Sequence, residues 1–252
     1  MAPVAIARRA LVTGGAAGLG RAFVTELLAR GYDVVSVDRA APAANDAWLS
    51  ILCDLADRQD VDRNLEAILA GGPYEIVIFN AGVSATGRFE NIPFSAYRAL
   101  MTVNAETPML LAASLMRAGA VTRHMCFVSS LSHYTGYPGA AVYAASKDAL
   151  AVYARSVRRP FGRLGVRVCT AYPGPLRTEH ASRHAPPGAD ARRRVRPELA
   201  ARRILDAALA GRATAFSDPR ARAIAAAGRL FPGRLIRAMR RTIFDRLEQD
   251  VW

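Results

Sequence analysis

The chain has 252 residues and a formal net charge of +13, with 34 Lys and Arg against 21 Asp and Glu. This length is enough for one large α/β domain or two small ones with a well-buried core. No apolar run approaches the ~20 residues of a membrane-spanning helix, and residues 1–9 are too short and interrupted for a secretory signal, so we expect neither. The three cysteines are scattered through apolar stretches, which favours reduced thiols in a cytoplasmic protein over disulfides.

A glycine-rich turn follows the first predicted strand. Residues 10–13 are apolar enough for a buried strand, and residues 21–30 are predicted to form a helix that Gly31 ends. Glycines permit a tight turn and close backbone approach, and a helix N-terminus attracts phosphate groups. The order of strand, glycine turn and helix predicts a dinucleotide-binding site. Its residues are Gly14, Gly18, Leu19 and Gly20.

An acidic residue ends the next predicted strand, residues 34–37. Asp38 lies about 20 residues beyond the glycine turn, where a carboxylate can accept hydrogen bonds from the adenosine ribose. The same carboxylate repels a 2′-phosphate, whereas Arg39 either holds that phosphate or is a solvated residue of an arginine-rich chain. We therefore expect NAD(H) to be favoured over NADP(H), with Asp38 and Arg39 at the adenosine end of the site.

The third and fourth predicted strands, residues 49–53 and 76–79, also end in residues suited to a cofactor. The Asp54 carboxylate suits either the adenine amino group or the cap of the helix predicted for residues 58–69. Small residues after the fourth strand let the backbone lie against a cofactor. We expect the following residues at the cofactor site: Asp54, Leu55, Asn80, Ala81 and Gly82.

A proline interrupts the long helix predicted for residues 95–118. Pro108 has no N–H and therefore removes the hydrogen bond to the carbonyl of Asn104, four residues back. We expect a distortion at Asn104, which is either a functional feature or only a proline kink.

A serine, a tyrosine and a lysine form the predicted catalytic centre. The strand predicted for residues 125–128 leads to Ser130, and ligands of open α/β sheets bind where strands end. A helix is predicted to open near Tyr143, and Lys147, four residues on, shares its face. A phenol ordinarily titrates at about 10, and a neighbouring cation lowers that pKa. Tyr143 can then exchange a proton with a substrate oxygen held by Ser130, although the spacing also fits an ordinary surface lysine.

The composition of the chain favours the catalytic interpretation. Lys147 is the only lysine, and the other 33 of the 34 basic residues are arginine. A lysine ammonium is a compact charge on a flexible stem, so it can lie under a phenol and a ribose, whereas a guanidinium is broad and planar. A single lysine placed at random would fall here about once in 34 times. We infer that this position requires an amine.

The remaining chain continues the alternation of strands and helices. A strand is predicted at residues 166–171, and a helix and a last strand at residues 197–210 and 213–216. Residues 179–196 are rich in Pro, Ala and Arg without an apolar period, which predicts a mobile loop over the site. No linker or internal repeat divides the chain, so residues 1–252 are predicted to form one doubly wound α/β domain.

These motifs together resemble the compact, single-domain branch of the short-chain dehydrogenase/reductase family. The resemblance covers essentially residues 8–220 and rests on motif order and on the placement of Ser130 thirteen residues before Tyr143. The matching positions are residues 13–14, 18–20, 80–82, 104, 130, 143–147, 173–174 and 178. Phe79 and Thr107 depart from the family pattern, where an asparagine and a glycine are common. The resemblance implies a three-layer Rossmann fold with a mostly parallel, seven-stranded sheet and helices on both faces.

The resemblance also implies roles for the site residues. Tyr143 would be the general acid/base, and Lys147 would lower its pKa while binding the nicotinamide ribose. Ser130 would position the substrate oxygen, and Asn104 would hold a water that relays protons to Lys147. The residues implied to hold the nicotinamide end are Pro173, Gly174 and Thr178. The implied activity is NAD(P)-dependent hydride transfer between a secondary alcohol and a ketone, in a homodimer or homotetramer.

The substrate and the exact reaction are less determined by pattern. An epimerase or dehydratase would use the same cofactor, and a reductase of acidic or carrier-bound 3-oxoacyl substrates is an alternative. A non-catalytic dinucleotide-binding regulator is disfavoured because all four catalytic residue types are present. His133 and Tyr137, just after Ser130, line the substrate pocket or are merely exposed. His180 and His184 lack further ligands at metal spacing, so no metal site is predicted.

The positive charge is concentrated in the C-terminal part. Residues 155–252 carry +14 and residues 1–154 carry −1. Arginines in the predicted substrate loop and helix, residues 179–212, can steer an acidic substrate. Those of the basic C-terminal segment, residues 220–252, alternate with apolar residues and can lie on an anionic membrane surface. The simpler interpretation is a solvated surface around an oligomer interface, and without a nucleic-acid-binding motif we expect no nucleic-acid partner.

Overall fold

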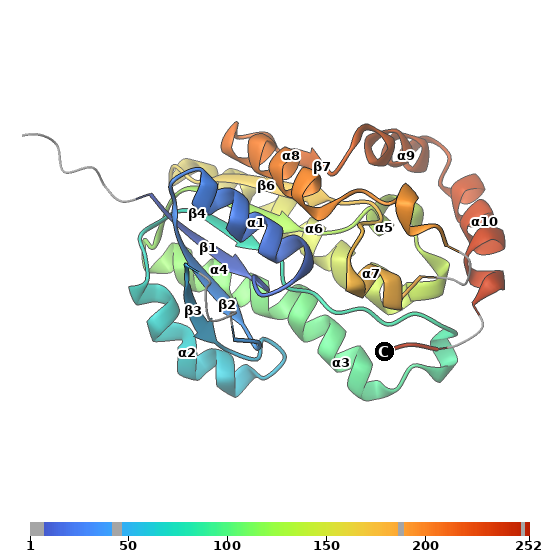
Figure 1. Ribbon diagram of the computed structural model, residues 1–252, viewed down its shortest axis with the longest axis horizontal. Coiled ribbons are helices and arrows are strands. Elements are labelled where there is room, and N and C mark those ends of the chain that lie inside the picture. Colours follow the sequence, from blue (N-terminus) through green and yellow to red (C-terminus); the bar gives the residue numbers. More distant parts are fainter. Residues whose placement is uncertain (1–7, 42–46, 186–188, 248–249) are drawn as a thin grey trace, which may run out of the picture.

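The computed structural model describes residues 8–41, 47–185, 189–247 and 250–252. They form one seven-stranded sheet, parallel throughout, in the order β3-β2-β1-β4-β5-β6-β7 (Figure 1). The strands are β1 (Arg9–Thr13), β2 (Asp33–Asp38), β3 (Leu49–Leu52), β4 (Tyr74–Phe79), β5 (Val121–Val128), β6 (Arg167–Tyr172) and β7 (Thr214–Phe216). The doubly wound Rossmann fold expected from the sequence is confirmed.

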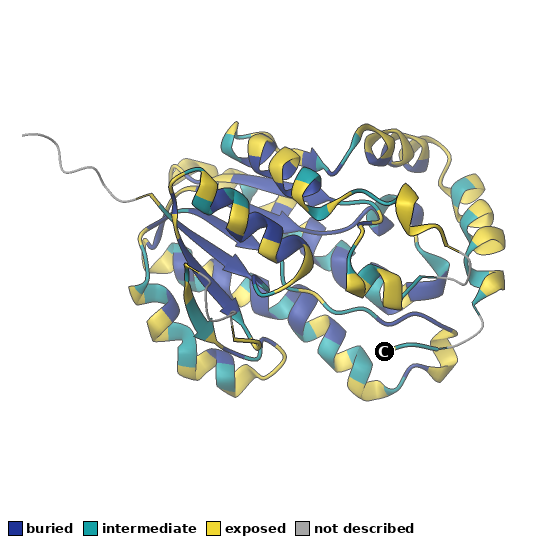
Figure 2. Cartoon of the chain, in the orientation of Figure 1, coloured by how far each residue is buried: buried dark blue, intermediate teal, exposed yellow. Residues whose placement is uncertain are grey.

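Helices cover both faces of this sheet. On one face lie α1 (Gly18–Ala29) and α8 (Pro197–Leu209), and on the other α2 (Arg58–Ala70), α4 (Thr107–Arg117) and α6 (Ala141–Arg163). The other helices are α3 (Phe94–Met101), α5 (Ser132–Thr135), α7 (Glu179–Arg183), α9 (Pro219–Leu230) and α10 (Pro232–Thr242). Short 3-10 turns occur at Phe89–Asn91, Pro138–Ala140, Ala191–Arg193 and Phe244–Arg246. Figure 2 shows the strands buried between helices whose outer sides are exposed.

Side chains alternate along the strands, so each helical layer has its own apolar core. In β4, Ile76 and Ile78 face α1 and α8, whereas Val77 and Phe79 face α2, α4 and α6. None of the four is more than 2% exposed. Burial on both faces is the reason that parallel strands consist of continuous apolar runs, which is the pattern that predicted them.

The sheet reverses its winding direction between β1 and β4. Ligands of open α/β sheets bind outside the carboxyl ends of the strands at such a point. The glycine turn begins there, and the Gly14 N–H donates to the carbonyl of Val37 in β2 at 2.8 Å. The fold therefore brings the glycine turn, Asp38 at the end of β2 and Asn80 after β4 to one edge of the sheet.

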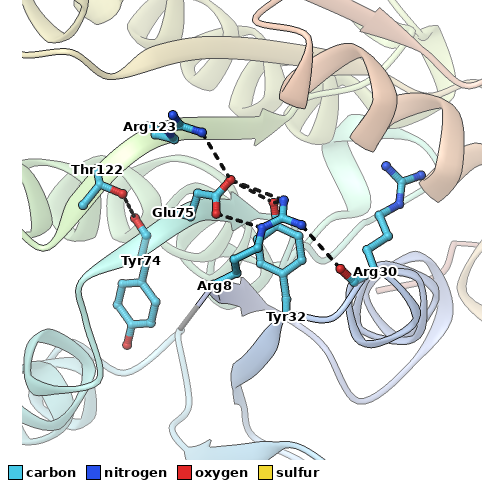
Figure 3. Close-up of polar contacts among 7 residues, drawn as sticks. All are labelled: Arg8, Arg30, Tyr32, Tyr74, Glu75, Thr122 and Arg123. Carbon is cyan, nitrogen blue, oxygen red and sulfur yellow. Dashed lines mark hydrogen bonds and ion pairs between the residues drawn. The ribbon is translucent and has the colours of Figure 1, made fainter. Parts of the chain in front are cut away.

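The opposite, amino-terminal edge of the sheet holds an ion-pair cluster (Figure 3). Glu75 in β4 accepts hydrogen bonds from Arg8 at 3.0 Å and from the Tyr32 hydroxyl at 3.2 Å. Arg123 in β5 lies 4.0 Å from the same carboxylate. The cluster joins the beginnings of the central strands at the end of the sheet away from the glycine turn, so we assign it to stability.

Cys53, Cys126 and Cys169 are all buried free thiols. A bilayer-spanning helix was not expected, and the described chain contains no helix with the length and apolar character that a span requires.

Candidate active site

The carboxyl end of β5 and the first turns of α6 bring three polar side chains together. Ser130 lies two residues beyond β5, and Tyr143 and Lys147 lie one turn apart on α6. The Ser130 hydroxyl accepts the Ser132 N–H at 3.1 Å and lies close to the Tyr143 phenol. Burial raises the pKa of Tyr143, and the neighbouring Ser130 hydroxyl offsets only part of this. The phenol is therefore protonated at neutral pH and able to donate.

Lys147 is buried beside this pair. Only 3% of the residue is exposed, and its Nζ donates to the carbonyl of Val128 at 2.9 Å. Burial lowers the pKa of the ammonium to about 8. Desolvation of the phenol outweighs the influence of Ser130, so the pKa of Tyr143 is raised overall. That Lys147 lowers this pKa stays a prediction.

A π-helical turn, Thr102–Glu106, interrupts the helix predicted for residues 95–118. The Thr107 N–H donates to the Thr102 carbonyl, five residues back, and Pro108 at the start of α4 has no N–H to offer. The distortion expected at Asn104 is therefore present, and Asn104 lies within this π-helical turn.

Asn104 and Lys147 meet at Gly82. The Asn104 amide is fully buried: its Nδ2 donates to the Val83 carbonyl and to Ser146 Oγ, both at 2.9 Å, and its Oδ1 accepts the Val83 N–H at 2.9 Å. A Cβ added at Gly82 would lie 3.1 Å from both Asn104 Oδ1 and Lys147 Nζ. The amide oxygen and the ammonium thus flank one glycine. That Asn104 also holds a relay water stays a prediction.

Asn80 stabilises the glycine turn through Thr13. Thr13 Oγ1 accepts the N–H groups of Asn80 and Ala81 at 3.0 and 3.1 Å, and Asn80 Nδ2 donates to the carbonyls of Thr13 and Gly14 at 3.1 and 3.2 Å. Gly14 has a positive φ of 71°, and a Cβ there would lie 2.8 Å from the Ala81 Cα. Only glycine allows the two backbones this approach. Asn80 therefore shapes the predicted cofactor site by holding its backbone.

Asp38 also holds the turn. Its Oδ2 accepts the Ala16 N–H at 2.9 Å and its Oδ1 accepts the Ala40 N–H at 3.0 Å, while Arg39 is exposed. The Asp54 carboxylate accepts the Ala56 N–H at 2.9 Å. The capping role considered for Asp54 is wrong, because the cap of α2 is Asp57, whose side chain accepts from Gln59 N.

Comparison with known proteins identifies the family. A family model described as short chain dehydrogenase matches residues 8–187. The chain belongs to the short-chain dehydrogenase family. An uncharacterized oxidoreductase of Myxococcus xanthus is 33% identical over 186 residues, which cover 68% of this chain and 73% of that protein. The 3-oxoacyl-[acyl-carrier-protein] reductase MabA of Mycobacterium tuberculosis is 29% identical over 180 residues, or 70% of this chain and 72% of that one.

Solved structures of short-chain dehydrogenases share the fold. One from Burkholderia cenocepacia, in complex with NADP, has a TM-score of 0.76 at 24% identity, with 94% of this chain and 97% of that chain covered. A bulky-bulky ketone specific alcohol dehydrogenase from Comamonas testosteroni has a TM-score of 0.71 at 18% identity, covering 83% and 85% of the two chains.

The residues of this short-chain dehydrogenase fit a dinucleotide. Within the described chain no side chain caps the N-terminus of α1, so its N–H groups are available to phosphate oxygens. Gly18 has a positive φ of 55°, and a Cβ there would lie 3.4 Å from Thr178 Cγ2. Thr178 therefore lies across the glycine turn. Hydrogen bonds of 3.0 Å fix the Pro173–Gly174 turn, from Leu131 N to the Pro173 carbonyl and from Gly174 N to Ser217 Oγ.

The two residues expected to line the substrate pocket differ in their positions. Tyr137 is close enough to Tyr143 and Arg194 for each to influence its pKa, which burial raises. His133 has other contacts. Its Nδ1 lies 2.9 Å from Asp148 Oδ1, and its ring stacks on Tyr172 with centroids 5.3 Å apart. The structure therefore places Tyr137 near the Tyr143 phenol and gives His133 packing contacts, because its ring completes an aromatic cluster.

Two histidines without a role in the sequence-based hypothesis also lie near the site. Burial lowers the pKa of His180, and the charges of Lys147 and Arg183 lower it further. The His180 and His184 rings lie 4.9 Å apart, and His184 Nδ1 lies 3.1 Å from Thr86 Oγ1. The described residues contain no group of three His, Cys, Asp or Glu side chains able to hold a metal ion.

The C-terminal tail pairs with the segment after β4, a contact that no sequence pattern indicated. Thr86 and Val251 exchange two backbone hydrogen bonds of 2.8 Å. Asp250 accepts the Arg88 N–H at 2.8 Å and the Asn91 Nδ2–H at 2.7 Å. The tail thus fastens the segment after β4, which also contacts His184 through Thr86.

The segment 179–212, expected to form a substrate loop and helix, divides into two parts. Residues 179–183 form α7, capped by Thr178 Oγ1, which accepts the Ala181 N–H at 3.1 Å. The expected irregular loop is therefore partly helical, and residues 186–188 lie outside the described chain. α8 packs on α1 through buried residues such as Ile204 and Leu205, so it belongs to the core.

Proposed function

We propose that this short-chain dehydrogenase interconverts a secondary alcohol and a ketone with a nicotinamide dinucleotide, using Tyr143 as the general acid/base. The observation that carries the proposal is the grouping of the Ser130 hydroxyl and the Tyr143 phenol at the end of β5, with the buried Lys147 ammonium one helical turn away. The alternative of a non-catalytic regulator has no support, since the chain retains each of these groups.

The side chains suit protonation of a substrate oxygen. A carbonyl oxygen bound next to Ser130 Oγ and Tyr143 Oη can accept from both hydroxyls. Tyr143, kept protonated by burial, gives its proton to this oxygen as the carbonyl carbon is reduced. The Lys147 ammonium then stabilises the phenolate through its charge. The dinucleotide, when bound, supplies or accepts the hydride.

We propose NAD(H) as the preferred cofactor, although several of the similar solved structures are complexes with NADP or NADPH. The Asp38 carboxylate at the end of β2 repels a 2′-phosphate. Arg39 is the competing group, because it is exposed and forms no ion pair with the described residues.

The test is turnover of a panel of ketones with NADH and with NADPH, measured for the wild type, Tyr143→Phe and Tyr153→Phe. Tyr153 is the matched control, since it lies on the same helix and its hydroxyl donates to the Met109 carbonyl at 3.2 Å. Tyr143→Phe should lose turnover on the order of 10³-fold and still bind NADH. Equal rates in wild type and Tyr143→Phe would refute the assignment.

A 3-oxoacyl thioester is the second candidate substrate. Curated relatives include the reductases MabA of Mycobacterium tuberculosis and FabG of Escherichia coli. The chain itself places Arg194 near Tyr137, where a cation can attract an acidic carrier or carboxylate. A 3-oxoacyl thioester in the same panel separates the two candidates.

We also propose a cytoplasmic homodimer or homotetramer. The free buried thiols favour a reducing compartment. Apolar side chains on α3, α4 and α6 are exposed, with Met101 at 42%, Leu110 at 38% and Val152 at 45%. These are the expected contacts between subunits, which sedimentation of wild type and Val152→Asp would test.

A further inference from the structure

The helices α9 and α10 form a basic corner at the edge of the molecule (Figure 1). Between residues 219 and 247 there are eight arginines and one acid, Asp245. Asp245 lies 3.9 Å from Arg240, and within the described chain no other arginine of this segment forms an ion pair. The positive charge of the corner is therefore largely uncompensated.

The arginines of α10 face solvent. Leu235 and Met239 are half-buried, and Ile236, although 41% exposed, lies against Gly136, whose added Cβ would be 3.2 Å from Ile236 Cδ1. Because these apolar residues form the inner face of the helix, its arginines lie on the outer face. Three of them line one shallow hollow of about 370 Å³: Arg234, Arg237 and Arg241.

Two large apolar side chains project at the junction of the helices. Leu230 ends α9 with 72% of its surface exposed, and Phe231, which links it to α10, is 54% exposed. Arg229 precedes them, and the Arg234 guanidinium lies 5.6 Å from the centroid of the Phe231 ring. An exposed apolar pair next to uncompensated cations is unfavourable in water alone.

We propose that this α9–α10 corner docks on an anionic phospholipid surface. Arginines near such a surface are attracted to its lipid phosphates, and stable attachment requires a second contribution from inserted apolar groups. Leu230 and Phe231 supply the apolar contribution, and Arg229, Arg234, Arg237 and Arg241 supply the electrostatic one. The docking surface is independent of the proposed chemistry.

A bilayer fits the corner better than an acidic protein. The apolar pair lies where α9 meets α10, and these helices lie at the edge of the molecule, so it can enter an interface without a matching pocket. α10 also contacts the loop at Gly136, next to Tyr137. Docking therefore brings the substrate side of the molecule close to the membrane, where apolar substrates accumulate.

Vesicle flotation of the full-length protein tests the proposal. Vesicles of phosphatidylcholine alone are compared with vesicles in which about one third of the lipid is phosphatidylglycerol, at low salt and at about 0.5 M salt. We expect binding to the anionic vesicles at low salt. The triple variant Arg234→Gln, Arg237→Gln, Arg241→Gln should bind on the order of 100-fold more weakly. Leu230→Ser with Phe231→Ser should bind at least about tenfold more weakly.

Controls with equal changes elsewhere separate docking from general charge attraction. Arg117, Arg159 and Arg163 are exposed on α4 and α6, and Leu164 is 68% exposed. Replacing these arginines by Gln, or Leu164 by Ser, should leave vesicle binding within about twofold of the wild type. An equal loss of vesicle binding in the control triple variant would overturn the proposal. So would the absence of binding to anionic vesicles, or capture of an acidic carrier protein without vesicle binding.

Discussion

Lys147 combines burial, charge and position in one side chain. Its Nζ donates to the Val128 carbonyl and lies next to Gly82, where even an added Cβ would be 3.1 Å away. A guanidinium is broader and needs several acceptors in one plane, which this position does not offer. The geometry thus explains why the only lysine of an arginine-rich chain occurs here.

The burial of Lys147 makes stability depend on pH. Because its pKa is lowered from 10.5 to about 8, the unfolded chain binds more protons than the native chain between these values. The free energy of unfolding should therefore rise with pH across this window, by about 3 kcal/mol from this group. Denaturant titrations of wild type and Lys147→Met, below pH 8 and above pH 10, measure the effect. A stability difference between the two proteins that does not change with pH contradicts the burial of a titrating ammonium.

We expect the Asp38 carboxylate to influence cofactor choice at the adenosine end. Asp38→Ser should raise kcat/KM for NADPH relative to NADH on the order of tenfold, the effect of about 1.4 kcal/mol of relieved charge repulsion. The control is Asp33→Ser, an exposed acid at the other end of β2. If the ratio of kcat/KM for NADPH to kcat/KM for NADH is the same in both variants and in the wild type, the Asp38 carboxylate does not discriminate between the two cofactors.

At the scale of elements, the interrupted helix shows how far local chemistry predicts structure. Pro108 predicted a distortion at Asn104 because a missing N–H affects a known position four residues back. The form of the distortion, a π-helical turn with a bond from Thr107 to Thr102, depends on tertiary contacts. One of these is the Thr107 hydroxyl, which donates to the Leu55 carbonyl at 2.9 Å, and no sequence pattern identifies that partner.

The pairing of the C-terminal tail with the segment after β4 was not predicted. A contact between two short segments that are distant in the sequence produces no periodic pattern of apolar residues. Asp250→Ala removes the bonds to Arg88 and Asn91 and should loosen the segment after β4. We expect KM for the ketone to rise on the order of tenfold, with the dissociation constant of the dinucleotide unchanged. Asp245→Ala, at a more exposed acid of the same C-terminal segment, is the control for steady-state kinetics. An unchanged KM in Asp250→Ala would show that the tail does not shape the substrate side.

His133 illustrates why the substrate side was harder to infer than the cofactor side. Its proximity in sequence to Ser130 suggested a place in the pocket, but an aromatic ring is attracted to other rings and to a carboxylate. Tyr172 and Asp148 come from β6 and α6, so their meeting with His133 depends on the assembled fold. The glycine turn and the Tyr143 to Lys147 spacing were predictable because each lies within one continuous segment.

For the molecule as a whole, the apolar runs and their alternation with helices predicted the sheet and its layers. The same patterns place the polar residues after the strands at one edge, which explains why the candidate site could be assembled from the sequence. The charge is distributed unevenly along the chain, since residues 155–252 carry the entire excess of positive charge. One part of that excess, at Arg194, lies near Tyr137, and another lies on the α9–α10 corner.

The most direct test of this account is kcat/KM for ketone reduction in Lys147→Arg, compared with Arg159→Lys on the exposed side of the same helix. The arginine keeps the positive charge but not the compact shape. We expect a loss of at least about 100-fold in Lys147→Arg and almost none in the control, in variants shown to be folded by circular dichroism. Activity of Lys147→Arg within about twofold of the wild type would contradict the claim that a small buried ammonium supports the tyrosine.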